Sequence, residues 1–484
     1  MPEILATAEA TKNYADRIWA ENPHISPDSW RILEGLTVSK VATGTYRMDG
    51  RDQQPLALEK ALTEGLNLID TSANYMDGGA EVFIGQTLQK LFTRDKLKRE
   101  EVVLVSKAGY VQGKTLARWQ NSPPSQVVKC AEHMWHCIHP DFLHSEFENS
   151  LKRLGVEGLD VYLLHNPEYF LIQAAESDTP LEEAQDEFYR RCQKAFEYLE
   201  TLCQQGKLGC YGVSANTLVS PSDMPDHVDL ARLFEAAQAA AREVWGRRKR
   251  PMLRVVQMPY NLVETGAITC VNTKAKTFKD SEPVSTLELA TRMRLSALIN
   301  RPLNAFSREG NAYRLADGNK TPELTPLIDA LAKAEAALPE NTELPRLSRM
   351  ADGLREQIQN SLHFDHLKTT AFTPLLVQTL SEADLTQQQK QDLIQAYTAV
   401  VNALREHARQ KDAAEHAALK KAIQARLPVP AKALPFQQVA LNTIASTPGV
   451  TSVLCGLRQP DYVADAIKVL EQGDFSDVGA VFAA

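Results

Sequence analysis

Residues 66–88 read LNLIDTSANYMDGGAEVFIGQTL and start with a short, mainly apolar run behind a glycine. A run this short and so bounded predicts a buried strand rather than a helix. The strand would end on Asp70, and Tyr75 follows it before two glycines, after which apolar residues recur at helical spacing. The stretch therefore predicts a strand, a turn and a helix, with a carboxylate and a phenol where α/β barrels place their chemistry. Taken alone, an Asp that caps the next helix and a surface Tyr would explain the pattern equally well.

The length and charge of the chain limit the classes of function. Its 484 residues exceed one ordinary domain, so we expect one large domain with an insertion or appendage. The net charge of −8 argues against nucleic acid as the main partner. The single strongly basic run, GRRKR at 246–250, follows a helical pattern and precedes a strand, which favours a solvated helix end.

Cysteine usage and hydropathy predict a cytoplasmic protein. The seven cysteines are scattered without CxxC spacing, as in the reduced thiols of an intracellular protein. No apolar run reaches the ~18 residues needed to cross a membrane. The N-terminal residues lack the basic and apolar segments of a secretory signal. We therefore expect neither a membrane nor a nucleic acid as partner.

Eight short apolar runs alternate with amphipathic helical patterns along the chain. The predicted strands are 36–47, 66–70, 101–107, 159–165, 208–214, 253–258, 297–300 and 452–455. This alternation predicts the α/β class and a closed parallel (β/α)8 barrel, the TIM barrel. The competing fold, a doubly wound open sheet, would call for a GxGxxG fingerprint after the first strand, and the sequence has none.

The spacing of the predicted elements divides the chain into three parts. Residues 1–35 read as a loosely ordered extension, residues 36–306 and 430–484 as the barrel, and residues 307–429 as a mostly helical insertion after the seventh strand. The insertion carries one apolar stripe, formed by Leu393, Tyr397, Val400, Val401 and Leu404. In the simpler interpretation, the stripe packs inside a small helical subdomain or onto the barrel. In the other, it is a surface for a protein partner or a lid over a cofactor.

Two shorter insertions follow the third and fourth strands, at 108–141 and 166–179. The first contains three histidines and a cysteine close together, but their spacing matches no standard zinc module, so we predict no metal site. Loops with aromatic and imidazole side chains at this place would instead shape a substrate pocket.

Four ionisable residues stand at or near the ends of predicted strands: Asp70, Tyr75, Lys107 and His165. In a parallel barrel all strands open on one face, so these side chains can converge. An ammonium beside a tyrosine lowers the phenol's pKa, and a carboxylate keeps the ammonium charged. The set therefore suggests proton delivery to a carbonyl oxygen, with the histidine orienting the substrate. Reduction also needs a hydride, which implies a nicotinamide cofactor.

This set, in this order, resembles the aldo-keto reductase superfamily. The motifs that carry the resemblance are Gly44-Thr45-Tyr46, Asp70-x4-Tyr75, Val105-Ser106-Lys107, Asp160-Val-Tyr-Leu-Leu-His165, Gly212-Val-Ser214, Gln257-x2-Tyr260-Asn261, Pro448-Gly-Val450 and Gly456-x-Arg458. The resemblance implies a (β/α)8 barrel, with Tyr75 as the catalytic acid and Lys107, Asp70 and His165 around it.

The resemblance also implies a cofactor site, less completely. Ser214 and Gln257 match the residues that hold the carboxamide, Tyr260 matches the ring that stacks on the nicotinamide, and Asn216 lies one step beyond the expected Asn, which is Ala215 here. The further cofactor residues are Gly44, Thr45, Asp70, Pro302, Leu303, Asn304, Gly456, Leu457, Arg458 and Asp465. Arg458 could pair with a 2′-phosphate, which favours NADP(H) over NAD(H).

The expected function is an NAD(P)H-dependent oxidoreductase that interconverts a carbonyl group of an aldehyde, ketone or sugar and an alcohol. The alternative is a cofactor-binding regulatory or scaffold subunit whose helical insertion binds a protein partner. The substrate and the direction of the reaction cannot be deduced from the sequence.

Overall fold

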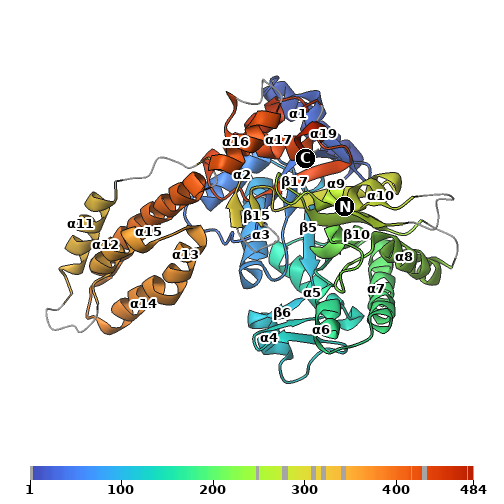
Figure 1. Cartoon of the computed structure of the whole chain (residues 1–484), viewed down its shortest axis with the longest axis horizontal. Coiled ribbons are helices and arrows are strands. Elements are labelled where there is room, and N and C mark those ends of the chain that lie inside the picture. The colour runs from blue at the N-terminus through green and yellow to red at the C-terminus, as the bar shows by residue number, and fades with distance from the viewer. Residues whose placement is uncertain are drawn as a thin grey trace. The chain divides into compact units, whose positions relative to one another are not determined.

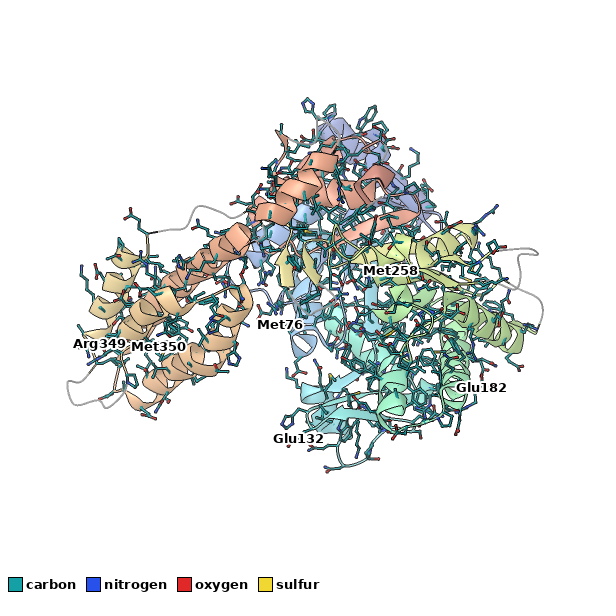
Figure 2. The ribbon with its side chains drawn as sticks, viewed as in Figure 1. Met76, Glu132, Glu182, Met258, Arg349 and Met350 are labelled. Atoms are coloured by element: carbon teal, nitrogen blue, oxygen red, sulfur yellow. The ribbon has the colours of Figure 1, made fainter. Side chains whose placement is uncertain are left out.

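The computed structural model describes residues 4–246, 250–274, 282–306, 312–317, 323–338, 345–415, 417–427, 433–476 and 478–482. The chain forms two compact units. The first comprises Met1–Leu303, Pro428–Leu434 and Gln438–Ala484, and the second comprises Asn304–Leu427 and Pro435–Gln437. Each unit has an apolar core of its own, and Figure 2 labels a methionine that contributes to each, Met258 in the first and Met350 in the second.

The first unit contains a closed barrel of eight parallel strands (Figure 1). In chain order they are β3 (Val41–Gly44), β4 (Leu68–Asp70), β5 (Val103–Ala108), β9 (Leu159–His165), β10 (Leu208–Ser214), β11 (Leu253–Pro259), β14 (Ser296–Asn300) and β17 (Val450–Cys455). Each strand pairs with the next, and β17 pairs with β3 to close the ring. The predicted TIM barrel is therefore confirmed.

Helices follow the strands, as the alternating pattern predicts. They are α2 (Gln54–Thr63), α3 (Gly79–Thr93), α5 (Pro140–Leu154), α7 (Leu181–Gln204), α8 (Leu230–Trp245), α10 (Thr286–Arg292), α17 (Phe436–Ala445) and α18 (Pro460–Glu471). Local signals set their ends: Asp229 caps α8 through the Ala231 N–H, and Gly246 ends it in the left-handed region.

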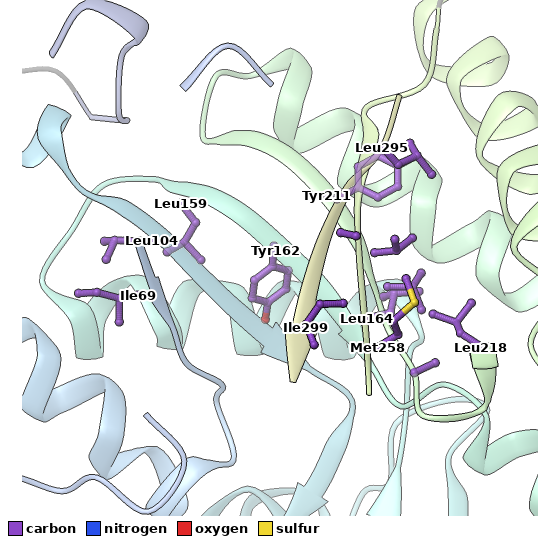
Figure 3. Close-up of a cluster of buried hydrophobic side chains, with 14 of the residues drawn as sticks. Ile69, Leu104, Leu159, Tyr162, Leu164, Tyr211, Leu218, Met258, Leu295 and Ile299 are labelled. Carbon is purple, nitrogen blue, oxygen red and sulfur yellow. The ribbon is translucent and has the colours of Figure 1, made fainter. Parts of the chain in front are cut away.

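Alternation along the strands separates two apolar layers. On β9, Val161 and Leu163 belong to a small cluster with Val105 and Val255. Tyr162 and Leu164 belong to the larger cluster that includes the helices' buried faces, part of which Figure 3 shows. Because successive side chains of a strand point to opposite faces, the first layer fills the barrel and the second packs between barrel and helices.

The described part of the N-terminal extension, residues 4–35, is not loosely ordered, contrary to the prediction. They form α1 (Ala8–Glu21), β1 (Trp30–Leu33) and β2 (Leu36–Ser39), and the last two pair antiparallel. Tyr14 of α1 is fully buried, and its hydroxyl donates to the Leu62 carbonyl at 2.8 Å. The predicted strand 36–47 is likewise wrong in its extent, since β2 ends at Ser39 and the barrel strand starts at Val41. An alternating pattern cannot reveal such a break, because both halves are strands.

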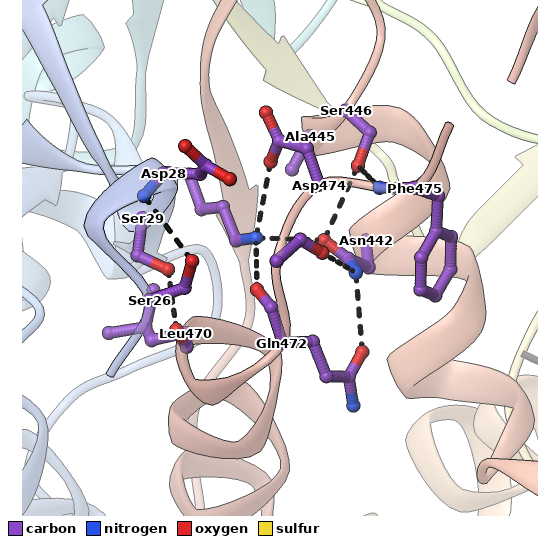
Figure 4. Close-up of polar contacts among 12 residues, drawn as sticks. Ser26, Asp28, Ser29, Asn442, Ala445, Ser446, Leu470, Gln472, Asp474 and Phe475 are labelled. Carbon is purple, nitrogen blue, oxygen red and sulfur yellow. Dashed lines mark hydrogen bonds and ion pairs between the residues drawn. The ribbon is translucent and has the colours of Figure 1, made fainter. Parts of the chain in front are cut away.

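The residue at this break, Lys40, anchors the amino end of the barrel. Its side chain is fully buried, and its Nζ donates to Asn442 Oδ1 at 2.9 Å, the Gln472 carbonyl at 2.8 Å and Asp474 Oδ1 at 3.3 Å (Figure 4). Burial lowers the pKa of Lys40 to about 8. The cluster ties β3 to the segments around α17 and α18.

The second unit is mostly helical. Its helices are α11 (Leu324–Glu335), α12 (Leu347–Gln357), α13 (Ser361–Leu367), α14 (Thr373–Glu382), α15 (Gln387–Glu415) and α16 (Ala417–Arg426), beside a short hairpin of β15 (Asn304–Phe306) and β16 (Ala312–Arg314). The apolar stripe predicted on residues 393–404 lies on α15 and is buried in this unit's own core. The simpler interpretation of the stripe, packing within a helical subdomain, is therefore confirmed. Among the described residues of the whole chain, no helix has the length and apolar character to span a bilayer.

Candidate active site

The four predicted catalytic residues all lie at the carboxyl end of the barrel. Asp70 and His165 are the last residues of β4 and β9, and Lys107 is the penultimate residue of β5. Tyr75 starts the 3-10 turn η2 (Tyr75–Gly78) that follows β4. A parallel barrel brings these strand ends to one mouth, as the sequence predicts.

A buried ion pair forms the floor of this mouth. The Lys107 Nζ donates to both carboxylate oxygens of Asp70 at 2.7 Å and to the Thr71 carbonyl at 2.9 Å. Lys107 is fully buried and Asp70 is 4% exposed. Burial lowers the pKa of Lys107, and the Asp70 carboxylate acts in the opposite direction. The three bonds use every donor of the ammonium and fix its position.

Tyr75 lies directly beside this pair. The Lys107 Nζ is 5.0 Å from the centre of the Tyr75 ring, and the rings of Tyr46 and His165 meet it edge to face at 5.3 and 5.9 Å. No described residue forms a hydrogen bond with the Tyr75 hydroxyl. The turn holds the ring through two strained residues, Met76 and Asp77, which have φ of 51° and 54°.

The expected lowering of the Tyr75 pKa is not found. Burial, together with the Asp70 charge, raises the pKa of Tyr75 well above its usual value. The larger cause is burial, which disfavours the charged phenolate, and the Asp70 charge acts in the same direction. At neutral pH Tyr75 therefore holds its proton, as an acid must before it delivers one.

His165 is held from two sides. Its ring Nδ1 lies 3.0 Å from the Ser72 hydroxyl, and its main-chain carbonyl accepts a bond of 2.7 Å from His136 Nε2. Burial and the Lys107 charge keep the pKa of His165 well below its usual value, and burial lowers that of His136 to about 4. Both imidazoles are therefore neutral at pH 7.

His136 comes from the first insertion, which folds as a three-stranded antiparallel sheet of β6 (Tyr110–Gln112), β7 (Val128–Ala131) and β8 (Met134–His136). The Tyr110 ring lies 4.9 Å from that of His165 and 5.5 Å from that of Tyr169 in the second insertion. Asp77 accepts the Lys114 N–H at 3.0 Å and so ties the turn after Tyr75 to this insertion. Aromatic groups of both insertions thus surround His165, as the sequence suggests.

Sequence reasoning missed Ser72 and Asn74, and it gave His136 only as one of three histidines of the first insertion, without a contact to His165. The first two lie inside the motif around Asp70, where a hydroxyl two residues after the carboxylate was the available signal. The position of His136 depends on an antiparallel sheet that no local pattern reveals. Within the described residues, no group of His, Cys, Asp and Glu side chains is placed to hold a metal ion.

Four of the predicted cofactor residues join the ion pair in one network. The Ser214 hydroxyl donates to Gln257 Oε1 at 2.9 Å, and Gln257 Nε2 donates to Asp70 Oδ1 at 2.7 Å. The N–H and hydroxyl of Thr45 both donate to the Asp70 carbonyl, at 3.0 and 2.9 Å, and Gly44 pairs with Asp70 between β3 and β4. Asp70 therefore couples the predicted catalytic and cofactor residues.

Two predicted cofactor residues lie differently from the expectation. Asn216 is exposed, and its N–H donates to Glu168 Oε1 at 2.8 Å, while Ala215 takes the buried position. Tyr260 is fully buried, its hydroxyl lies 3.1 Å from Thr447 Oγ1, and its ring lies 5.5 Å from that of Phe482. Tyr260 therefore does not present an open face for stacking.

The remaining predicted residues lie after the last two strands. Pro302 is buried and Leu303 half-buried after β14, whereas Asn304 is exposed and starts the second unit. After β17, Gly456 is exposed, and a Cβ at this position would have no atom within 4 Å; Leu457 is buried and Arg458 is half-buried. Asp465 of α18 accepts a bond of 2.7 Å from Gln438.

Comparison with known proteins finds similar sequences over part of the chain. The sequence profile described as "Aldo/keto reductase family" matches residues 40–265. The NADH-specific methylglyoxal reductase of Escherichia coli K12 is 30% identical over 140 residues, which cover 27% of this chain and 39% of that protein. Aldose reductase B of Dictyostelium discoideum is 27% identical over 230 residues, which cover 47% of this chain and 64% of that protein.

The chain thus spans less than two thirds of the length of these relatives. Among solved structures, an aldo-keto reductase from Bacillus halodurans in its holo form aligns with a TM-score of 0.46 at 14% identity, over 94% of this chain and 95% of that one. Over residues 40–265, which include six of the eight barrel strands, the chain is therefore similar to the aldo/keto reductase family.

Proposed function

We propose that this protein is an NADP(H)-dependent oxidoreductase that interconverts a carbonyl group and an alcohol. The observation that carries the proposal is the mouth of the barrel, where Lys107 and Asp70 form a buried, bidentate ion pair next to a tyrosine whose hydroxyl has no described partner. Two relatives are named as a methylglyoxal reductase and an aldose reductase. Both names refer to the reduction of a carbonyl compound, which fits this chemistry.

The residues at the mouth fit a nicotinamide in part. Ser214 and Gln257 are buried polar groups at the carboxyl ends of adjacent strands, and a carboxamide needs both a donor and an acceptor there. Gly456 leaves room for close approach of a phosphate to the backbone after β17. Tyr260 fits less well, because Phe482 packs against its ring. When bound, the cofactor would supply or accept the hydride that no side chain can carry.

The protein's own residues would handle the proton and the substrate oxygen. Tyr75, which is neutral at pH 7, would protonate the oxygen in reduction and receive its proton in oxidation. Lys107 would stabilise the phenolate that forms after the proton leaves, since its ammonium lies beside the ring. His165 would hydrogen-bond the substrate oxygen and orient it.

The choice of cofactor is part of the proposal. Arg458 follows Gly456 on the loop after β17 and could pair with a 2′-phosphate, which favours NADP(H). One relative is NADH-specific by name, so both cofactors belong in the test. The seven cysteines, all within the described residues, remain thiols, which supports the proposed cytoplasmic location.

The direct test is oxidation of NADPH and NADH by the full chain with a panel of aldehydes, quinones and sugars. Turnover with at least one carbonyl compound is expected. Tyr75→Phe should lower kcat by ~10³-fold, in the upper part of the range for losing a general acid, with cofactor binding unchanged. Tyr46→Phe, which alters the neighbouring ring, is the matched control and should retain turnover within a few-fold.

The alternative function, a cofactor-binding regulatory or scaffold subunit with a protein partner, is decided by the same assay. It predicts that wild type and Tyr75→Phe bind the cofactor alike and that neither turns over any compound of the panel. The stripe on α15 is buried, so a partner would have to use another surface of the helical unit.

A further inference from the structure

The amino end of the barrel holds a cavity of about 560 Å³, on the side away from the mouth. Ser296, the first residue of β14, and Thr451, the second residue of β17, line it and so place it at this end. Small-molecule sites in proteins commonly have this volume. The described residues that line it include none of the predicted catalytic or cofactor residues. A ligand bound here would therefore occupy a second site, separate from the mouth.

Three arginines gather at this cavity. Arg250 and Arg294 line it, and Arg250 Nη2 donates to the main-chain carbonyls of Met293 and Arg294, both at 2.9 Å. These bonds hold the two arginines next to each other. Arg254, the second residue of β11, donates from Nε to Glu34 Oε1 at 2.9 Å, and Glu34 lines the cavity.

The charges at the cavity do not balance. Glu34 is the one carboxylate among the described lining residues, so three guanidinium groups and one carboxylate leave a charge of +2. The side chain of Arg294 forms no hydrogen bond or ion pair with any described residue. Partial burial, and next the charge of Arg254, lower the pKa of Arg250, as expected of cations that lie close together. The cluster therefore favours a ligand with two negative charges.

The buried arginine of the cluster has an unused donor. Arg254 is 6% exposed, and its Nη1 is buried with no hydrogen-bond acceptor among the described groups. Folded proteins leave few buried polar groups unpaired. Arg254 lies where the pairing of β10 and β11 shifts by one residue, and such a bulge turns a side chain out of the regular ladder. This donor is available to an anion that enters the cavity beside Glu34.

We propose that this cavity binds a small phosphate ester, whose phosphate group pairs with Arg250, Arg254 and Arg294. Guanidinium groups match phosphate oxygens in geometry as well as in charge. Ile32 lines the same cavity and is 64% exposed, so it offers an apolar surface to the organic part of the ester. The proposal does not depend on the oxidoreductase activity.

Binding is measured by isothermal titration calorimetry of the full chain, with inorganic phosphate as the probe and sodium chloride of equal ionic strength as the blank. Wild type should bind phosphate at millimolar concentration. Arg294→Gln should weaken binding by ~10-fold, the size of one hydrogen bond between charged groups. Because the Arg294 side chain has no described partner, this variant leaves the fold intact. Arg292→Gln is the matched control, since Arg292 already pairs with Glu288, and it should leave binding within twofold.

Glu34→Gln gives the opposite change and separates the proposal from a purely structural Glu34–Arg254 pair. Removing the carboxylate should tighten phosphate binding by roughly tenfold, because it raises the net charge of the cluster and frees Arg254 Nε for the anion. A pair that only fastens the turn between β1 and β2 to the barrel predicts no gain in affinity.

Phenyl phosphate tests the organic part of the ligand. It should bind ~5-fold more tightly than inorganic phosphate, because its ring removes part of Ile32 from water. Ile32→Ala should abolish most of this gain and leave the affinity for inorganic phosphate unchanged. Equal binding of the two compounds by wild type would show that the cavity does not recognise an ester.

Two results overturn the inference as a whole. One is the absence of phosphate binding by wild type. The other is binding that Arg294→Gln leaves unchanged and that Arg458→Gln removes, which would place the phosphate on the loop after β17. Neither result bears on turnover with carbonyl compounds, so the proposed function stands or falls separately.

Discussion

Two buried lysines stand at opposite ends of the barrel and differ in what surrounds them. Lys40 precedes β3 at the amino end, and Lys107 lies near the carboxyl end of β5; both are fully buried. Each ammonium has three oxygen acceptors within the protein. Burial alone therefore does not distinguish a structural lysine from a catalytic one.

The difference lies in the groups next to the ammonium. Around Lys40, the side-chain amide nitrogen of Asn442 donates to Gln472 Oε1 and to the Gly473 carbonyl, so the cluster is closed on itself. Next to Lys107 stands Tyr75, whose hydroxyl has no described partner, and the Asp70 that holds Lys107 also binds Gln257. A network that ends in an unused donor can act on a ligand, whereas a closed one stabilises the fold.

Replacing the carboxylate that pairs with each lysine should give the largest difference in stability and turnover between the two sites. Asp70→Asn leaves Lys107 buried without its counter-charge, which should cost about 3–5 kcal/mol of stability and lower turnover by ~10²-fold or more. Asp474→Asn removes a partner that is 34% exposed and should cost less than about 1 kcal/mol, with turnover unchanged. Chemical denaturation and steady-state kinetics measure both. Equal losses in the two variants would contradict the distinction.

The pH dependence of stability should report Lys40. Its pKa is about 8 in the folded chain and near ~10.4 in an unfolded one. Between these values the unfolded chain binds more protons, so the free energy of unfolding should rise with pH, by up to ~1.4 kcal/mol per unit. Below pH 8 the contribution should be flat. Urea unfolding of wild type and Lys40→Met across pH 7–10 measures the difference, and parallel curves would refute this assignment.

Adding a methyl group to Gly109 at the mouth should lower the stability of the fold, because other atoms already occupy the position of the new carbon. A Cβ on Gly109 would lie 2.3 Å from the His165 carbonyl oxygen and 2.5 Å from His136 Nε2. Gly109→Ala should therefore cost about 1–3 kcal/mol and lower turnover, since His165 must shift. Gly353→Ala, in open space on α12, should instead stabilise by about 0.5–1 kcal/mol. Thermal unfolding of the two variants measures both changes in stability. An unchanged stability of Gly109→Ala would contradict the prediction, since it would mean that the mouth is less tightly packed.

The smallest effect is expected where Phe482 covers Tyr260. Removing that ring in Phe482→Ala should free the face of Tyr260 and tighten NADPH binding by roughly threefold, in the range of a single aromatic contact. Fluorescence titration measures the change. Weaker binding would show that Phe482 supports the cofactor site instead of covering part of it.

The barrel and its strand ends could be predicted because they depend on local patterns. Alternating strands and amphipathic helices, together with the absent glycine fingerprint, are sufficient for the closed ring, and a parallel ring places Asp70, Lys107 and His165 at one mouth. The roles assigned to these residues still rest on the proposed function.

What could not be predicted depends on contacts between distant segments. Phe482 meets Tyr260 from the far end of the chain, and His136 reaches His165 through a small antiparallel sheet. The raised pKa of Tyr75 follows mainly from burial of its hydroxyl and then from the Asp70 charge, and a motif does not reveal that burial. The order of residues 4–35 was missed because burial of Tyr14 depends on a partner at Leu62.

The most direct test exchanges each lysine for methionine and measures turnover and stability of both variants side by side. The account predicts that Lys107→Met loses at least ~10²-fold in kcat, while Lys40→Met keeps kcat within a few-fold of wild type and loses stability only. Full turnover in folded Lys107→Met, or an equal loss of kcat in both variants, would contradict it.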